Sequence, residues 1–522
     1  MQSRPMPVVV CTGLLAGALT ALTGAAAQAA STRYEAESAP AVCTGTIDSD
    51  WPGHSGSGFC NGANAIGAYA QFTVSAPAAG AATLRVRFAN GTAVARPAVL
   101  TVNGSAAQTV SFEGTGAWST WATRALTVSL KAGSNTVRLT PITSGGLPNI
   151  DYIEVETDGD DTAPPTGPVL YAAPDGRDDA SGTESDPTTI TAAIDRVPAG
   201  GTIYLRGGTY RLSRTVTIAQ GNSGTAAARK NLFAHPGETP VLDFSAMSED
   251  PANRGLALNG SYWHVKGIVV ERAGDNGIFV GGSHNILERT VTRFNRDTGL
   301  QLSRISSSTP RDQWPSYNLI VSAVSHDNAD SDGEDADGFA AKLTSGPGNV
   351  FRYSVAHNNI DDGWDLYTKS DTGAIGPVTI EDSLSYGNGA LSDGTQNPSG
   401  DRNGYKLGGE DIGVDHVIRR SIAYRNGKHG FTYNRNPGTM TVSGNVAVDN
   451  AQRNFSFEAG TSVFRDNTSC RSGGGGNDKI VGDADGSNQF WFGSNGSRCS
   501  SYSGALRWSF DADGRLIVTF GG

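Results

Sequence analysis

The chain carries a repeated hydrophobic and polar pattern between about residues 265 and 460. Short strands that recur at intervals of about 20–40 residues, each closed by glycine or asparagine, are typical of a β-solenoid. Asparagine suits such a corner because its amide can bond the next coil and its backbone tolerates left-handed geometry. Six times an aliphatic residue is followed four positions later by asparagine: Val291/Asn295, Val324/Asn328, Val355/Asn359, Leu384/Asn388, Ile422/Asn426 and Val446/Asn450.

A second frame follows in each unit, usually polar residue, glycine, aromatic residue. Because equivalent positions on successive coils stack about 4.8 Å apart, Asp337 and Asp362 are predicted to share a corner, and Asp365 and Lys406 an outer face. Alternation along a strand predicts that positions +2 and +4, which are apolar, face the interior and that +3 faces solvent. Counted from the residue before the glycine, position +3 holds Phe279, Gln301, Ala340, Asp365, Lys406 and Thr432.

Four carboxylates and one lysine converge on a single patch in this register. Stacked like charges repel one another unless they are compensated. A hard divalent cation resolves the conflict, and an all-oxygen set without histidine or cysteine favours Ca²⁺. The alternative is a solvated acidic rim, but acids in stacked register beside an outward lysine favour a cation site. The residues are Asp337, Asp361, Asp362, Asp365 and Lys406.

Three segments resemble the family 9 polysaccharide lyases of the pectate lyase L type, over about residues 168–470. They are Asp337-Gly338-Phe339-Ala340-Ala341-Lys342, Asp361-Asp362-Gly363-Trp364-Asp365-Leu366-Tyr367 and Asn403-Gly404-Tyr405-Lys406-Leu407-Gly408-Gly409. The resemblance implies an all-β fold, a right-handed parallel β-helix. It also implies that Asp337, Asp361, Asp362 and Asp365 bind a catalytic calcium and that Lys406 is the base. The loop 390–402 is one possible departure, because it is rich in Gly, Ser and Asp and borders the lysine frame.

Residues 33–156 have a different sequence pattern. Short segments alternate between apolar and polar residues, Asn-Gly turns separate them, and the asparagine repeat is absent, which predicts a β-sandwich. The segment begins with Tyr34-Glu35-Ala36-Glu37 and ends with Asn149-Ile150-Asp151-Tyr152-Ile153. These two ends resemble carbohydrate-binding modules of families 6 and 35. That resemblance implies a structural calcium on Glu35, Glu37 and Asp151. It also implies a glycan contact at Asn149, with Tyr69 or Trp118 as a stacking platform, although both rings also suit packing inside the sandwich.

The domain plan has four parts: a secretory signal at 1–30, the sandwich at 31–157, a Pro/Gly linker at 158–168 and the β-helix at 169–522, whose residues 470–522 we expect to form the last coil and a cap. The signal consists of Arg4, an apolar run and a small-x-small site at Ala27-Gln28-Ala29. Later in the chain nothing reads as a transmembrane span. The expected location is therefore extracellular.

Five cysteines are present, and Cys11 lies in the signal, which leaves an even number for an oxidising compartment. The pairing Cys43–Cys60 and Cys470–Cys499 is favoured because each pair lies within one module, and two other connectivities remain open. The net charge of −11 makes nucleic acid a poor partner. An anionic polyuronate needs a bridging cation, and Arg289, Arg293, Arg296 and Arg304 either add local positive charge or form ordinary solvated faces.

The expected function is that of a secreted, calcium-dependent, monomeric pectate lyase acting on polygalacturonate or pectin, with a module that binds plant cell-wall glycan. Calcium would act as Lewis acid and template in β-elimination. One alternative is a polygalacturonase-like hydrolase with paired acids, but the Gly-His-Gly and Arg-x-Lys segments expected of that class are absent. A non-catalytic solenoid that binds calcium and glycan is the other alternative.

Overall fold

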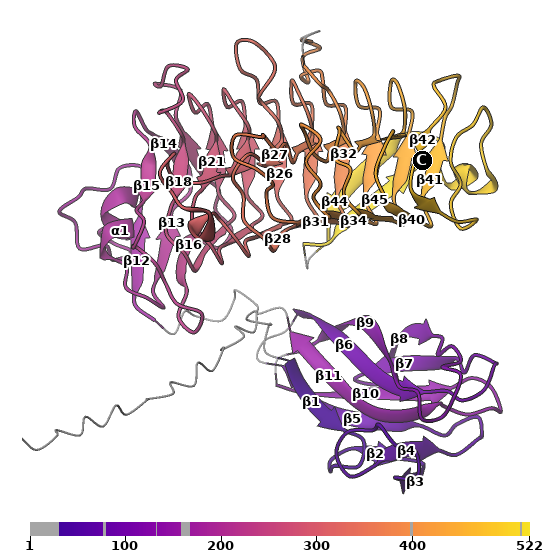
Figure 1. Cartoon of the computed structure of the whole chain (residues 1–522). Coiled ribbons are helices and arrows are strands. Elements are labelled where there is room, and N and C mark those ends of the chain that lie inside the picture. The colour runs from indigo at the N-terminus through magenta and orange to yellow at the C-terminus, as the bar shows by residue number, and fades with distance from the viewer. Residues whose placement is uncertain are drawn as a thin grey trace, which may run out of the picture. The chain divides into compact units, whose positions relative to one another are not determined.

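The computed structural model describes residues 31–76, 80–131, 133–157, 167–396, 400–511 and 514–521. The predicted signal at 1–30 and residues 158–166 of the predicted linker lie outside the described residues. The chain divides into two compact units, Met1–Thr162 and Ala163–Gly522, and the division falls inside the range predicted as a linker (Figure 1).

The first unit is a sandwich of two antiparallel sheets. Strand β5 shows why the sequence forms such layers, because its alternate residues Phe72 and Val74 are buried in the core. One sheet has the order β3 (Gly45–Asp48), β4 (Phe59–Gly62), β11 (Asn149–Thr157), β6 (Gly80–Ala89), β9 (Ala122–Leu130), and β1 (Ser31–Glu35) also pairs with β11. The other has the order β2 (Val42–Cys43), β5 (Ala70–Ala76), β10 (Gly133–Pro141), β7 (Ala98–Val102), β8 (Ser105–Val110).

The second unit is a β-helix of three parallel sheets that run along its axis, as predicted (Figure 1). The first sheet contains β12 (Val169–Ala172), β13 (Thr202–Leu205), β16 (Lys230–Ala234), β19 (Trp263–Lys266), β22 (Ile286–Glu288), β25 (Leu319–Val321), β28 (Asn349–Arg352), β31 (Val378–Glu381), β34 (Val417–Arg419), β37 (Thr441–Ser443), β40 (Val463–Arg465) and β43 (Asp483–Ala484). The second contains β14 (Gly208–Arg211), β17 (Pro240–Asp243), β20 (Val269–Glu271), β23 (Val291–Arg293), β26 (Val324–His326), β29 (Val355–His357), β32 (Leu384–Tyr386), β35 (Ile422–Tyr424), β38 (Val446–Val448) and β41 (Thr468–Cys470).

The third sheet carries the repeated glycine frame. It contains β15 (Val216–Ile218), β18 (Leu256–Leu258), β21 (Ile278–Val280), β24 (Leu300–Leu302), β27 (Phe339–Ala341), β30 (Trp364–Asp365), β33 (Tyr405–Lys406), β36 (Phe431–Thr432), β39 (Phe455–Phe457) and β42 (Lys479–Ile480). Its register confirms the predicted columns, since Ala340 pairs with Asp365 and Asp365 with Lys406. The apolar positions on either side, such as Trp364 and Leu366, lie in the central core.

The predicted asparagine ladder is present at the corner that follows the second sheet. Each side-chain Nδ2 donates to the Oδ1 of the asparagine on the next coil, at 2.8 to 2.9 Å. The left-handed backbone expected at these asparagines falls instead on the residue before each one, for example Asp327 and Asn358, with φ near 55°. The ladder runs through Asn295, Asn328, Asn359, Asn388, Asn426 and Asn450.

The two ends of the β-helix differ. Helix α1 (Ile190–Arg196) begins at Thr189, whose side chain accepts a hydrogen bond from Ala192, and its buried face joins the core at the N-terminal end. Short 3-10 helices lie at η1 (Arg311–Gln313) and η2 (Ser497–Tyr502). Strands β42 and β43 complete the last coil, as expected, but the remaining residues form a hairpin of β44 (Leu506–Phe510) and β45 (Leu516–Phe520).

The hairpin corrects the expectation of an end cap. Trp508 donates a hydrogen bond from Nε1 to the hydroxyl of Tyr386 in β32, and Ser322 donates to the carbonyl of Gly514. The C-terminal segment therefore runs back along the side of the second sheet, where apolar side chains such as Phe520 bury against Tyr424. Both predicted disulfides are confirmed, Cys43–Cys60 in the sandwich and Cys470–Cys499 in the β-helix unit, with Cα–Cα distances of 5.7 and 5.5 Å.

Candidate active site

Three carboxylates meet on the outer face of the third sheet. Asp337 and Asp362 lie at equivalent corners two residues before β27 and β30, and Asp365 ends β30. Among the described residues they form the one group of three possible metal ligands whose oxygens all lie within 4.8 Å of one another. The backbone N–H of Asp362 donates to Oδ1 of Asp337 at 3.2 Å, which ties the two corners together.

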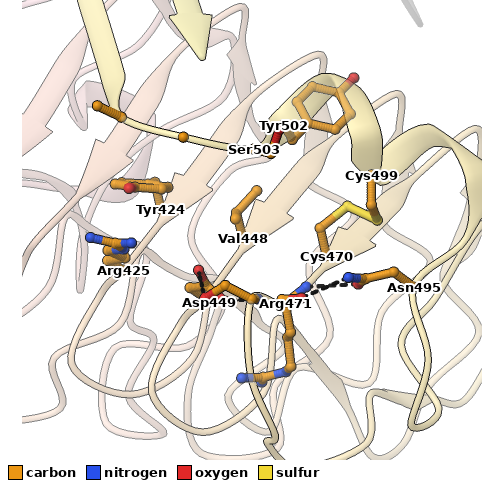
Figure 2. A pocket seen from close by; sticks show the side chains of 13 residues that line it. Tyr424, Arg425, Val448, Asp449, Cys470, Arg471, Asn495, Cys499, Tyr502 and Ser503 are labelled. Atoms are coloured by element: carbon orange, nitrogen blue, oxygen red, sulfur yellow. Dashed lines mark hydrogen bonds between the residues drawn. A yellow bond between two sulfur atoms is a disulfide. The ribbon is translucent and has the colours of Figure 1, made fainter. Parts of the chain in front are cut away.

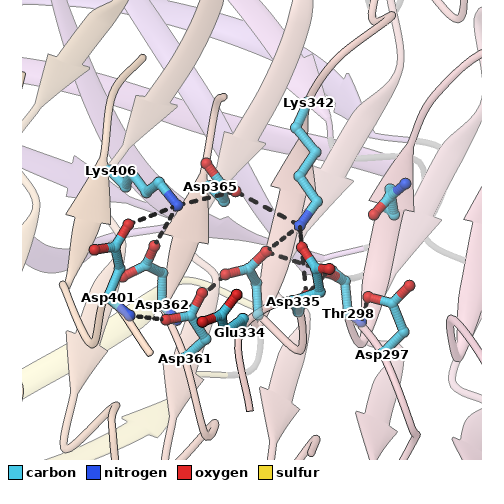
Figure 3. A network of polar contacts seen from close by, with 12 residues as sticks. Asp297, Thr298, Glu334, Asp335, Lys342, Asp361, Asp362, Asp365, Asp401 and Lys406 are labelled. Carbon is cyan, nitrogen blue, oxygen red and sulfur yellow. Dashed lines mark hydrogen bonds and ion pairs between the residues drawn. The ribbon is translucent and has the colours of Figure 1, made fainter. Parts of the chain in front are cut away.

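Two lysines flank these carboxylates (Figure 3). The Nζ of Lys406 lies 3.3 Å from Oδ2 of Asp362 and 3.5 Å from Oδ2 of Asp365. On the other side, the Nζ of Lys342 lies 2.7 Å from Oδ2 of Asp337 and 3.5 Å from Oδ2 of Asp365. The sequence predicted the position of Lys406, but Lys342 lies beyond the end of its strand, where the columns give no register.

The site is buried, contrary to the prediction that position +3 faces solvent. Asp365 is 3% exposed and Lys406 is 7% exposed. Both side chains lie outside the central core, on the outer face, but the surrounding charged groups and the ring of Tyr367, 5.3 Å from the Lys406 Nζ, cover them. Buried charges in mutual contact make the electrostatics of this site strong.

Asp401 and Asp361 complete the charged network from the loop side. Asp401, which sequence reasoning missed, lies 3.0 Å from the Nζ of Lys406 and 2.8 Å from that of Lys428. The Oδ1 of Asp361 accepts hydrogen bonds from the backbone N–H groups of Asp401 and Arg402. Asp361 adjoins Asp362 but is not part of the group of three acids whose oxygens lie within 4.8 Å of one another, and the loop engages one of its oxygens, so its role as a fourth ligand stays a prediction.

Burial sets the protonation of the acids. It raises the pKa of Asp337 and of Asp361 well above the ordinary value, and neighbouring carboxylates raise both further. Burial raises the pKa of Asp362 to about 7, although the charge of Lys406 acts in the opposite direction. These carboxylates are thus held close together at an energetic cost that only a positive charge offsets.

For the two lysines, burial and the neighbouring charges change the pKa in opposite directions. Burial alone would lower the pKa of Lys406, but the charges of Asp365, Asp362 and other carboxylates raise it well above its ordinary value. The pKa of Lys342 is raised in the same way, chiefly by Asp337 and Asp365. Without further positive charge in the cluster, both lysines are held in their protonated form.

The donor set fits a hard divalent cation. Oδ1 of Asp365 is buried and has no hydrogen-bond or ion-pair partner among the described residues, and Oδ2 of Asp362 faces only the Nζ of Lys406, at 3.3 Å. A carboxylate oxygen left open in this way, with no histidine or cysteine in the group, matches the ligands that Ca²⁺ prefers. The network lines a hollow of about 460 Å³, which gives a ligand access to both lysines.

A larger hollow of about 520 Å³ lies elsewhere, under the C-terminal segment (Figure 2). It is bordered by Tyr424 and Val448 of the second sheet and by the Cys470–Cys499 disulfide. Its one acid, Asp449, accepts hydrogen bonds from Ser472. This hollow is a packing seam between the hairpin segment and the sheet, and the charged network does not border it.

In the sandwich, the three predicted calcium ligands converge on one loop. The Ser55 hydroxyl donates to Glu35 at 2.7 Å, and its backbone N–H donates to Asp151 at 3.0 Å. The N–H of Ser57 donates to Oε1 of Glu37 at 2.8 Å. Asp151 also pairs with Arg87, and its pKa is raised by burial. A structural calcium at Glu35, Glu37 and Asp151 stays a prediction.

The predicted glycan contacts of the sandwich are only partly brought together. Asn149 is buried at the start of β11, and Trp118 is partly exposed. Arg96 lies between Trp118 and the segment that precedes Asn149, because its guanidinium lies 5.1 Å from the Trp118 ring and donates to the carbonyl of Leu147 at 2.8 Å. Tyr69 lies directly before β5 of the other sheet, with Arg138 4.0 Å from its ring centre.

No helix of the described residues is long and apolar enough to cross a membrane. Residues 170–468 match the family described as "Pel9A-like, right handed beta helix region". The chain is 51% identical to "Pectate lyase L" of Paenibacillus polymyxa (strain SC2), over 67% of this chain and 79% of that protein. The "Crystal structure of pectate lyase Pel9A" matches with a TM-score of 0.57 and 31% identity, over 67% of this chain and 88% of that one.

The sandwich has its own matches. Residues 69–155 match the family described as "Alpha-galactosidase, CBM13 domain". The structure "CBM35 from Cellvibrio japonicus Abf62" is 40% identical over 24% of this chain and 92% of that one, with a TM-score of 0.24. The chain therefore belongs to the Pel9A-like family of right-handed β-helix proteins, a polysaccharide lyase family whose members include proteins named pectate lyase, and it carries an N-terminal module of the carbohydrate-binding type.

Proposed function

We propose that this chain is an exported, calcium-dependent pectate lyase that cleaves uronate-containing polysaccharide by β-elimination, with Lys406 as the base. The single observation that carries the proposal is the contact of Lys406 with Asp362 and Asp365, at 3.3 and 3.5 Å, beside the open Oδ1 of Asp365. The relatives named pectate lyase support the substrate class.

In β-elimination a base removes the C5 proton of a uronate, a double bond forms between C4 and C5, and the C4 glycosidic oxygen departs. Asp337, Asp361, Asp362 and Asp365 would hold the calcium ion. The ion supplies a Lewis acid for the uronate carboxylate, where charge develops as the C5 proton leaves.

Lys406 must be neutral to accept a proton, whereas its neighbouring carboxylates hold it protonated. Positive charge that neutralises those carboxylates removes the cause of the raised pKa. Lys406 lines the hollow in which a sugar ring can lie. Lys342, paired with Asp337 on the opposite side of Asp365, balances the charge of the remaining acids.

Export is supported by the apolar run and the Ala27-Gln28-Ala29 site in the sequence, and by two disulfides, which persist in oxidising compartments. We also propose that the sandwich unit binds plant cell-wall glycan through the surface around Trp118 and Arg96, with Asn149 behind it. Binding there would hold the catalytic unit near insoluble substrate.

The decisive experiment follows ultraviolet absorbance while the protein acts on polygalacturonate, pectin and rhamnogalacturonan, with and without calcium. A lyase leaves an unsaturated, ultraviolet-absorbing uronate at the new chain end. New reducing ends without that absorbance would identify a hydrolase instead. If no polymer yields either product, the protein only binds glycan, and the proposal is overturned.

A further inference from the structure

The hollow around Lys406 does not end at the acid cluster. A second hollow, of about 320 Å³, is lined by Arg254, Phe279, Gln301 and Arg304 on coils nearer the N-terminus. Leu343 and Lys369 line both hollows. The two spaces therefore adjoin and form one groove, which we call the extended groove.

The floor of the extended groove is one column of the third sheet. Phe279 pairs with Gln301, Gln301 with Ala340, and Ala340 with Asp365, so that these four residues and Lys406 follow one another on five neighbouring strands. The column runs along the axis of the β-helix, across the strands, with steps of about 4.8 Å. A linear polymer that crosses the Lys406 site in this direction continues over Gln301 and Phe279.

The extended groove is cationic beyond the acid cluster. Neither Arg304 nor Lys369 has a carboxylate within 4.0 Å among the described residues. The guanidinium of Arg254 lies 3.5 Å from the ring centre of Phe279, and it pairs with a single acid, Asp275, at 3.4 Å. One further acid, Asp371, lies on the wall.

Arg304 differs from the other arginines of its sequence cluster. Arg289, Arg293 and Arg296 each pair with a glutamate, at 3.7, 2.7 and 3.3 Å. Arg304 is half-buried at the groove wall, and its backbone N–H donates to Thr344, which fixes its position. Gln301 lines the same hollow. A cationic side chain on a groove wall with no carboxylate partner is available to an anionic ligand.

We propose that the extended groove is a second carboxylate-binding region for an acidic oligosaccharide, in which Arg304 binds a uronate carboxylate two to three coils from Lys406 and Arg254 on Phe279 forms a platform for a further sugar. The inference rests on the proposed function, because it assumes that the chain acts on a polyuronate. An arginine can bind a carboxylate through two parallel hydrogen bonds, which makes Arg304 the main determinant. Because of this region, long oligomers should bind more tightly, and have a lower KM, than short ones.

The test compares wild type with Arg304→Gln and Arg304→Lys on oligogalacturonates from two to eight sugars. In Arg304→Gln, KM for the longest oligomers should rise about tenfold with kcat unchanged, since charge-assisted hydrogen bonds are strong, and the shortest oligomers should be unaffected. Arg304→Lys should recover part of the loss. Arg211→Gln, on an exposed residue of the second sheet, is the matched control and should behave as wild type.

A binding measurement separates the proposed function from the extended groove. Calorimetry with calcium compares the octamer affinity of Lys406→Ala with that of the double variant Lys406→Ala, Arg304→Gln. If wild type releases no unsaturated product, the proposed function fails. If wild type is active but Arg304→Gln keeps the wild-type dependence on chain length and the wild-type octamer affinity, the extended groove is wrong and the proposed function stands. Circular dichroism and calcium titration check that the variant is folded with an intact acid cluster.

Discussion

Asp365 and Lys406 are register partners on the neighbouring strands β30 and β33, and Oδ2 of Asp365 lies 3.5 Å from the Nζ of Lys406. The same oxygen lies 3.5 Å from the Nζ of Lys342. One carboxylate thus stands between two ammonium groups, and the protonation of each lysine depends on the same acid. The two lysines can still be told apart by mutation, because of the two only Lys406 also contacts Asp401.

Replacing Lys406 with alanine should lower kcat by about 10²–10⁴-fold, the usual contribution of a general base. Calcium affinity, measured by calorimetry, should be retained or increased, because a positive charge leaves the acid cluster. Lys479→Ala removes an exposed lysine from β42 of the same sheet and should leave both quantities unchanged. A Lys406→Ala enzyme within about tenfold of wild type would move the role of base to another residue, with Lys342 as the first candidate.

Removal of metal should abolish turnover, and added calcium should restore it. Chelation with EGTA tests this directly. Asp362→Asn and Asp365→Asn should lose both activity and calcium binding, and the isosteric amide is the right change because both side chains are buried. Asp371→Asn, on the exposed groove wall, keeps the acid cluster intact and should still bind calcium. Full activity after exhaustive chelation would contradict the calcium assignment.

Asp401→Asn should shift the pH dependence of kcat toward lower pH. The carboxylate of Asp401 is one of the charges that raise the pKa of Lys406, so its loss lets Lys406 become neutral at a lower pH. Lys428→Gln should shift the profile in the opposite direction, because it leaves the charge of Asp401 to Lys406 alone. Rate profiles of both variants with saturating calcium measure the effect, and shifts of the same sign in both would rule out this role.

The sequence was sufficient to predict the register of the site but not its full membership. Alternation within β30 and β33 places Asp365 beside Lys406 without any knowledge of the loops. Lys342 could not be assigned, because its strand ends at Ala341 and its side chain folds back to Asp337. Asp401 lies in a loop without periodicity, and nothing local indicates that this loop covers Lys406. The returning hairpin was missed for a related reason, since its apolar residues suit an end cap equally well.

His416 should make the β-helix unit sensitive to acid. It is fully buried, accepts a hydrogen bond at Nδ1 from the N–H of Val378, and burial lowers its pKa to about 3. Between pH 6.5 and about 3 the unfolded chain binds a proton that the folded chain refuses, so the unfolding free energy falls as the pH falls, by about 1.4 kcal/mol per unit.

The matched variant is His416→Asn, because Asn318 and Asn349 accept the equivalent bond on earlier coils. Denaturant unfolding of both proteins at several pH values gives the difference in their unfolding free energy, in which the contributions of the other titratable groups cancel. The unfolding free energy of the variant should rise relative to that of wild type as the pH falls from 6.5 to about 3. A difference that does not change with pH would show that the burial of His416 carries no such cost.

Deleting residues 33–156 should spare activity on soluble polygalacturonate, because the chain forms two separate compact units. Activity on insoluble wall material should fall, since tethering raises the effective substrate concentration. Comparing initial rates on the two substrates measures the effect. Trp118→Ala in the whole chain should reproduce the loss on insoluble material alone. Loss of activity on soluble polymer after the deletion would place the module in the catalytic machinery.

The asparagine ladder has a consequence for the groove, because it lies at the corner from which each strand of the third sheet begins. Each inner rung accepts a hydrogen bond from the coil before it and donates one to the coil after it, so Asn359 bonds both Asn328 and Asn388. The ladder therefore fixes the distance between successive coils of the solenoid. Because Gln301, Asp365 and Lys406 are carried on the same coils, the distances between their side chains are set by amides that never meet a ligand.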